Sequence, residues 1–168
     1  MENIINNTVV QATENTGSEK ELKEIGIFKD NCNLHLRSLA SEYLSLNGLL
    51  RMLENVIEQD DNIEYSTCEV VKLLREESDT LQESTENYIY PEEEGETSED
   101  LKTLKEQFKR FLKIIFDDTM ELNAVASVLV EAMKQDEQEN KICYILTVKM
   151  AVKKLNDVIE RIVVLLKD

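Results

Sequence analysis

The stretch CNLHLRSLASEYLSLNGLLRMLENVI, residues 32–57, decides the fold of this chain. Its apolar residues recur at alternating steps of three and four, a spacing that places them in one row along an α-helix. A row this regular is typical of a helix that packs along its whole length against other helices. The predicted row is Cys32, Leu36, Leu39, Tyr43, Leu46, Leu50, Leu53 and Ile57.

The composition agrees with an all-α protein. The 168 residues include four glycines and one proline, Pro91, too few for the turns of a sheet protein. We therefore expect an all-α, antiparallel four-helix bundle with long, coiled-coil-like helices and a flexible amino-terminal arm. The predicted segments are the arm 1–17, a single bundle domain 18–168 with helices at about 18–59, 67–87, 99–134 and 141–167, and an acidic loop 88–98.

The boundary between the last two helices rests on the phase of the apolar residues, because KQDEQENK (134–141) contains no glycine or proline. Extending the row of the third helix would place Asp136 and Glu139 in the core, so the break in phase predicts a turn. The alternative is one helix of about 70 residues, which would form a coiled-coil dimer. The predicted row of the third helix is Leu101, Leu104, Phe108, Phe111, Ile115, Asp118, Leu122, Val125, Leu129 and Ala132.

Negative charge is concentrated in one region. Residues 54–100 carry seventeen acidic side chains against Lys72 and Arg75, which accounts for −15 of the net charge of −16. The segment 141–168 carries a net charge of +3. Such a distribution favours a basic partner surface and disfavours direct binding of nucleic acid.

One end of the predicted bundle is rich in apolar residues. This end, which we call the pole, gathers residues 27–40, 78–87, 99–116 and 155–167. It holds all four phenylalanines and the run IVVLL (162–166), with only the acidic half of the second helix to cover them. We expect an apolar groove there, rimmed by acidic residues. The predicted protein-binding residues are Phe28, Phe108, Phe111, Ile162, Val163, Leu165, Glu77, Asp79, Glu83, Glu92, Glu93 and Glu94.

Two other arrangements would cover the pole with the chain's own residues. The amino-terminal arm, with its apolar pairs at 4–5 and 9–10, could fold back over it, or the fourth helix could lie centrally under the first and third. Tyr88 and Tyr90 lie in the loop beside the pole, where they either pack on the end of the bundle or form a docking or phosphorylation strip.

The sequence contains no pattern typical of catalysis. The one histidine, His35, is faintly similar to the phosphoacceptor of two-component phosphotransfer bundles, but the similarity covers about four residues and no glycine follows it. A di-iron bundle needs two Glu-x-x-His motifs, which are lacking. The acidic trio Asp117, Asp118 and Glu121 is interpreted as a solvated face, and the three cysteines as reduced, buried small side chains.

We therefore expect a non-enzymatic helical adaptor without a metal or other cofactor, which assembles with a protein partner or with itself through amphipathic helices. The first alternative is an acidic mimic of nucleic acid that inhibits a basic DNA- or RNA-binding protein. The second is a histidine phosphotransfer domain using His35. No segment is long and apolar enough for a membrane span, and the start lacks the features of a signal peptide, so an intracellular location, cytoplasm or nucleus, is expected.

Overall fold

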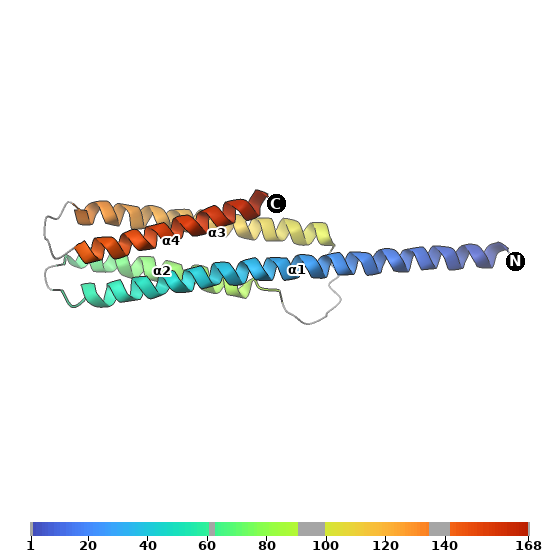
Figure 1. The fold of residues 1–168 in the computed structure, drawn as a ribbon, viewed down its shortest axis with the longest axis horizontal. Helices are drawn as coiled ribbons and strands as arrows, with labels where there is room; N and C mark the ends of the chain where they lie inside the picture. The colour runs from blue at the N-terminus through green and yellow to red at the C-terminus, as the bar shows by residue number, and fades with distance from the viewer. Residues whose placement is uncertain (1, 61–62, 91–99, 135–141, 168) are drawn as a thin grey trace.

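The computed structural model contains four helices and no strand among the residues it describes. It describes the backbone of residues 2–60, 63–90, 100–134 and 142–167, and the side chains within these ranges from residue 19 onward. The helices are α1 (Glu2–Ile57), α2 (Tyr65–Asn87), α3 (Leu101–Lys134) and α4 (Ile142–Lys167). They run antiparallel in chain order and form an elongated bundle (Figure 1). The predicted all-α, four-helix bundle is confirmed.

The helices are arranged so that α1 packs on α2 and α4, and α3 packs on α4 and α2. The pairs α1–α2 and α3–α4 make the most extensive contacts, and α2 and α3 pack less closely. The bundle is therefore two helical hairpins that are more open between α2 and α3. The chain reverses direction between Lys134, where α3 ends, and Ile142, where α4 begins, so the prediction of two helices is right and the single long helix is wrong.

The helix α1 begins at Glu2, whereas the sequence predicted that the first helix starts near residue 18. No proline interrupts 2–17, and extending an existing helix adds one hydrogen bond per residue without a new nucleation step. The amino-terminal part of α1 runs straight on beyond the other helices (Figure 1). It does not fold back over the pole, and its flexibility stays a prediction.

The core contains the predicted row of α1 in full. All eight residues of this row, which begins at Cys32 and ends at Ile57, are buried. Leu36, Leu39 and Tyr43 are completely inaccessible to solvent. In α4 the buried row contains Val148, Leu155 and Ile162, and Ile145, Val152, Ile159 and Leu166 lie half-buried beside it.

The predicted row of α3 is wrong at three of the five positions of its second half, whereas Leu122 and Leu129 are buried as predicted. Thr119, Ala126 and Met133 are buried, whereas the predicted Asp118, Val125 and Ala132 are exposed. A strict 3-4 alternation drifts around a helix of 3.6 residues per turn, and the core of this bundle follows the neighbouring positions. The consequence is that Val125 and its neighbours lie outside the core.

A polar contact crosses the core between α1 and α3. The Tyr43 hydroxyl lies 2.6 Å from Thr119 Oγ1, and both residues are fully buried. The Thr119 hydroxyl donates to the carbonyl of Ile115 at 2.5 Å, so Tyr43 is the donor in the contact with Thr119. Burial raises the pKa of Tyr43 to about 12. This hydrogen bond therefore holds Tyr43 of α1 opposite Thr119 of α3, across the diagonal of the bundle.

Ion pairs join α1 to both of its neighbours. The Arg75 guanidinium of α2 lies 2.6 Å from the Glu54 carboxylate of α1 and 3.0 Å from Asp79, and Arg51 also contacts Asp79, at 3.3 Å. The Glu54 contact raises the pKa of Arg75. On the other side, Lys154 and Arg161 of α4 lie 3.5 and 3.7 Å from Glu42 of α1.

Candidate protein-binding grooves

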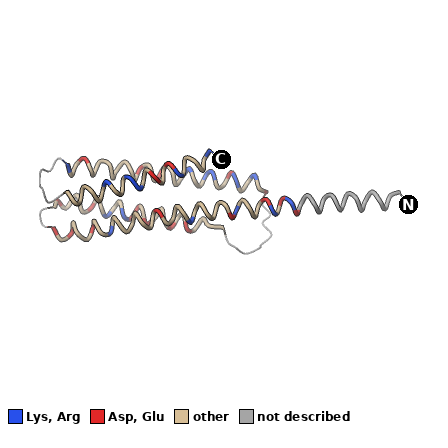
Figure 2. Tube along the Cα trace, in the orientation of Figure 1, with Lys and Arg blue, Asp and Glu red and all other residues tan. Residues whose placement is uncertain are grey.

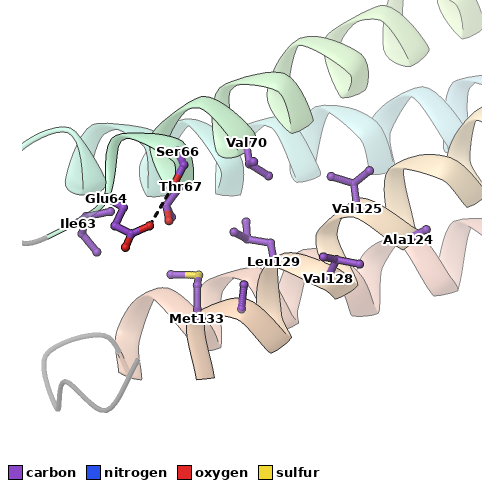
Figure 3. Close-up of a pocket in the computed structure, with 11 residues that line it drawn as sticks. Ile63, Glu64, Ser66, Thr67, Val70, Ala124, Val125, Val128, Leu129 and Met133 are labelled. Atoms are coloured by element: carbon purple, nitrogen blue, oxygen red, sulfur yellow. Dashed lines mark hydrogen bonds between the residues drawn. The ribbon is translucent and has the colours of Figure 1, made fainter. Parts of the chain in front are cut away.

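An open groove of about 650 Å³ lies between the start of α2 and the C-terminal half of α3. Figure 3 shows Val70 on α2 facing Leu129 on α3 across this space, with Met133 beside it. Leu129 and Met133 are buried core residues, whereas Val128 at the edge is 68% exposed. The groove therefore has a floor of core side chains and an apolar border that no other described helix covers.

A second hollow, of about 310 Å³, continues this groove along the same two helices, and Val125 lines both. The border there includes Leu73 of α2, which is 55% exposed. With a rise of ~1.5 Å per residue, α3 spans roughly 22 Å from Asp118 to Met133, the length of about four helical turns. The two hollows together form the α2–α3 groove, lined by Ile63, Glu64, Ser66, Thr67, Val70, Leu73, Leu74, Glu77, Asp118, Glu121, Leu122, Ala124, Val125, Val128, Leu129, Ala132 and Met133.

The charged residues that line the α2–α3 groove are all acidic: Glu64, Glu77, Asp118 and Glu121. The Glu64 carboxylate accepts a hydrogen bond from Ser66 at 3.2 Å, drawn as the dashed line in Figure 3. In the part of the chain that the structure describes, no lysine, arginine or histidine lines this groove. Its rim therefore carries negative potential beside an apolar floor, a combination suited to a basic amphipathic ligand.

These carboxylates do not form a metal site. Among the described residues, no group of three or more His, Cys, Asp or Glu side chains converges as metal ligands would. The sequence interpretation of Asp117, Asp118 and Glu121 as an exposed face agrees with their exposure. In the described residues there is also no helix long and apolar enough to cross a membrane.

A different groove, of about 890 Å³, lies at the pole, between α1 and the first turns of α3. Phe28, Phe108 and Leu165, three of the predicted binding residues, line it. Phe108 is buried and packs edge-on against Phe28, with ring centroids 6.0 Å apart. We call this the pole groove; its other lining residues are Glu21, Asn31, Cys32, His35, Asp100, Leu101, Lys102, Lys105, Glu106 and Lys109.

The rim of the pole groove differs from the prediction. No carboxylate of α2 lines it, and its charged residues are Glu21, Asp100 and Glu106 together with a row of three lysines on α3. The Asp100 carboxylate caps α3 by accepting a hydrogen bond from the Thr103 N–H at 2.7 Å, which lowers the pKa of Asp100. The predicted contribution of α2 to an acidic rim is therefore not found among the described residues of this groove, whereas the predicted contribution of Glu92, Glu93 and Glu94 lies outside the described residues.

The other predicted binding residues are dispersed. Glu77 lines the α2–α3 groove, and Glu83 is exposed beside a shallow hollow between α1 and α2. Asp79 is held by Arg75 and Arg51 within the bundle. Ile162 is fully buried, Val163 and Phe111 are half-buried, and Glu92, Glu93 and Glu94 lie outside the described residues.

Tyr88 and Tyr90 pack on the bundle, the first of the two roles predicted for them. The ring of Tyr88 stacks on Phe111 with centroids 3.9 Å apart. The Asn33 side chain donates to the Tyr90 carbonyl at 3.0 Å and accepts from the Tyr90 N–H at 2.8 Å. Residues 88–90 therefore close the side of the pole where α2 ends.

The remaining residues singled out in the sequence are His35 and the three cysteines. His35 is half-buried in the lining of the pole groove. Of the cysteines only Cys32 is buried, Cys68 is half-buried and Cys143 exposed, so the predicted burial is right for one of the three. Burial raises the pKa of the Cys32 thiol to about 12. A thiol with so high a pKa is inert at neutral pH.

The sequence reasoning missed Val125 and Val128 as exposed groove residues. A signal was present: Ala124, Val125, Val128 and Ala132 form a second apolar row beside the core row of α3. Two adjacent apolar rows exceed what one bundle core needs.

Comparison of the chain with protein-family models, with curated proteins and with solved structures gave no match.

Proposed function

We propose that this protein is a non-enzymatic helical adaptor whose α2–α3 groove binds an amphipathic helix with basic flanks, supplied by a protein partner. The observation that carries the proposal is the combination of an apolar floor, exposed Val125 and Val128, and a rim whose charged residues are all acidic. In helix-in-groove binding, apolar anchors of the ligand supply affinity and its flanking charges supply specificity.

The shape of the groove supports a helix as the ligand. Its length of about four turns accommodates anchors at positions i, i+3 or i+4, i+7 and i+11 of a helix. Lysine or arginine residues beside these anchors would reach Glu77 and Glu121, for which the described residues provide no ion-pair partner. Burying the exposed methyl groups of Val125 and Val128 would add to the binding free energy, at roughly 25 cal/mol per Å² before the cost of association.

The test uses a fluorescent, designed amphipathic peptide of about 18 residues, with leucine anchors and lysine flanks. Its affinity for the full chain is measured by fluorescence anisotropy. The variant Val128→Glu is expected to weaken binding about tenfold or more, because it places a carboxylate where an apolar anchor would be buried. The matched control is Met52→Glu on α1, since Met52 is 66% exposed, as Val128 is at 68%, and lines no described groove. Binding to the control should stay within about twofold of the wild-type value.

Two results would overturn the proposal. One is an absence of binding by the lysine-flanked peptide. The other is an affinity that Val128→Glu and Met52→Glu change equally, because the peptide would then be attracted to negative charge in general. A nucleic-acid mimic would behave in that second way, and its affinity would also fall steeply between about 50 and about 200 mM salt.

A further inference from the structure

The pole groove lies beside the last turn of α4, between α1 and the first turns of α3. In Figure 1, the N-terminal turns of α3 and the adjoining part of α1 extend past the end of α4 at Lys167. On the opposite side of this part of the bundle, Tyr88 packs on Phe111 and Tyr90 is bound to Asn33. Of the described segments, α1, α3 and residues 88–90 fill the cross-section at the pole, and none of them lies in line with α4.

The floor of this position is apolar. Phe28 of α1, Phe108 of α3 and Leu165 of α4 line it, and Phe28 and Leu165 are only half-buried. About four turns of α1 (21–35) and about two and a half turns of α3 (101–109) border it, so an added helix would contact the same kind of surface that α4 contacts in the rest of the bundle. A groove between two helices is a setting in which amphipathic helices bind.

The charge at the edge of the pole groove differs from that of the α2–α3 groove. Lys102, Lys105 and Lys109 lie at i, i+3 and i+7 on α3, so they form one exposed row along the opening. Among the described residues none of the three has a carboxylate within ion-pairing distance, and Lys105 Nζ lies 5.9 Å from the centre of the Phe28 ring. Figure 2 shows that basic residues, in blue, occur repeatedly along the N-terminal half of α3.

Three carboxylates also line this groove, so its acidic and basic residues are equal in number, but they are distributed unequally. Glu21 lies on α1, and Asp100 accepts the capping hydrogen bond at the start of α3. Along residues 101–109 of α3, the three lysines of the lining are accompanied by one carboxylate, Glu106. The edge formed by α3 therefore favours carboxylates, whereas the edge formed by α1 does not.

From this arrangement we propose a second docking site, in which the pole groove binds an amphipathic helix of a protein partner that carries Glu or Asp along one flank. Its apolar face lies on Phe28, Phe108 and Leu165, in line with α4, and its carboxylates meet Lys102, Lys105 and Lys109. With the α2–α3 groove, the chain then has two sites that select helices of opposite charge and can bridge two partners.

The experiment uses a fluorescent amphipathic peptide with the same leucine anchors as before and glutamate in place of the flanking lysines. The double variant Lys105→Glu/Lys109→Glu reverses the charge of two of the three lysines in the row. The control Lys149→Glu/Lys153→Glu on the exposed face of α4 makes the same change of net charge away from both grooves. All four positions are exposed, and a thermal unfolding curve verifies that each variant is folded. Affinity is measured by fluorescence anisotropy and molar mass by light scattering.

We expect the glutamate-flanked peptide to bind the wild-type chain, to lose about tenfold or more in affinity in Lys105→Glu/Lys109→Glu, and to bind Lys149→Glu/Lys153→Glu within about twofold of wild type. Val128→Glu should leave this binding unchanged, which separates a failure here from a failure at the α2–α3 groove. The proposal is overturned if the peptide does not bind, if the two double variants weaken it equally, or if light scattering reveals a dimer that only Lys105→Glu/Lys109→Glu dissociates. In the last case the occupant is a second copy of the chain.

Discussion

The direction of the hydrogen bond between Tyr43 and Thr119 predicts unequal effects for the loss of its two partners. Tyr43 donates to Thr119 Oγ1, and the Thr119 hydroxyl donates to the Ile115 carbonyl. Tyr43→Phe removes the donor and leaves Thr119 with its bond to Ile115. Thr119→Val removes the acceptor and leaves the Tyr43 hydroxyl buried without a partner. An orphaned buried donor is more destabilising than a lone pair that goes unused.

These changes can be given approximate magnitudes. Tyr43→Phe should lower the free energy of unfolding by about 1 kcal/mol, the net value of one hydrogen bond. Thr119→Val keeps the side-chain volume but strands a hydroxyl in a site with no solvent access, and should lower it by about 2 kcal/mol or more. The double variant has neither polar group, so adding Tyr43→Phe to Thr119→Val should restore stability rather than reduce it further.

The assay is urea unfolding followed by circular dichroism, for the wild-type chain, both single variants and the double variant. The interaction energy of the resulting double-mutant cycle should be about 1 to 3 kcal/mol. The reasoning is refuted if Thr119→Val is no more destabilising than Tyr43→Phe, or if the two effects are additive. Either result would mean that the donor direction inferred from Ile115 is incorrect, or that water reaches this part of the core.

Two further predictions concern titrating groups. Tyr43 has a pKa of about 12 in the folded protein against 10.0 for the free side chain, so the unfolded chain loses this proton first as pH rises and stability falls between about pH 10 and 12. Urea unfolding followed by circular dichroism at a series of pH values should show that the free energy of unfolding falls by about 2 to 3 kcal/mol over this range, and by less in Tyr43→Phe. An unchanged fall in Tyr43→Phe would contradict this. So would an equally reduced fall in Tyr65→Phe, at a position that is 77% exposed. The cysteines should react with a thiol reagent in the order of their exposure, Cys143 first and buried Cys32 only on unfolding, as peptide mass spectrometry would show; early labelling of Cys32 would contradict the core assignment.

The periodicity of the sequence predicted the long helices because each must bury an apolar row against its neighbours. The row from Cys32 to Ile57 is buried residue by residue as expected. The turn after α3 was predicted from a change of phase alone, since a continuous helix would have put Asp136 and Glu139 into the core. These are properties of the local chain, so they can be read without knowing what packs against it.

The candidate site depends on information that is not local. Val125 was assigned to the core and is 45% exposed, because the position of α2 relative to α3 decides which of two adjacent apolar rows is covered. Likewise Glu77 and Asp79 are alike in sequence, yet Glu77 lines a groove while Asp79 is held by two arginines from different helices. Neither outcome follows from spacing along one helix.

The amino-acid sequence by itself determined an all-α bundle, its helix count and the apolar pole, since these follow from the type and period of side chains along the chain. Only the tertiary structure decided where the bundle is open and which charges border each opening. Helix pairing and the path of the chain after α2 determine that: residues 88–90 close one side of the pole, and α2 packs less closely on α3 than on α1. A groove is formed by the surfaces of different segments. Whether it stays uncovered therefore depends on the free energy of packing of the whole bundle.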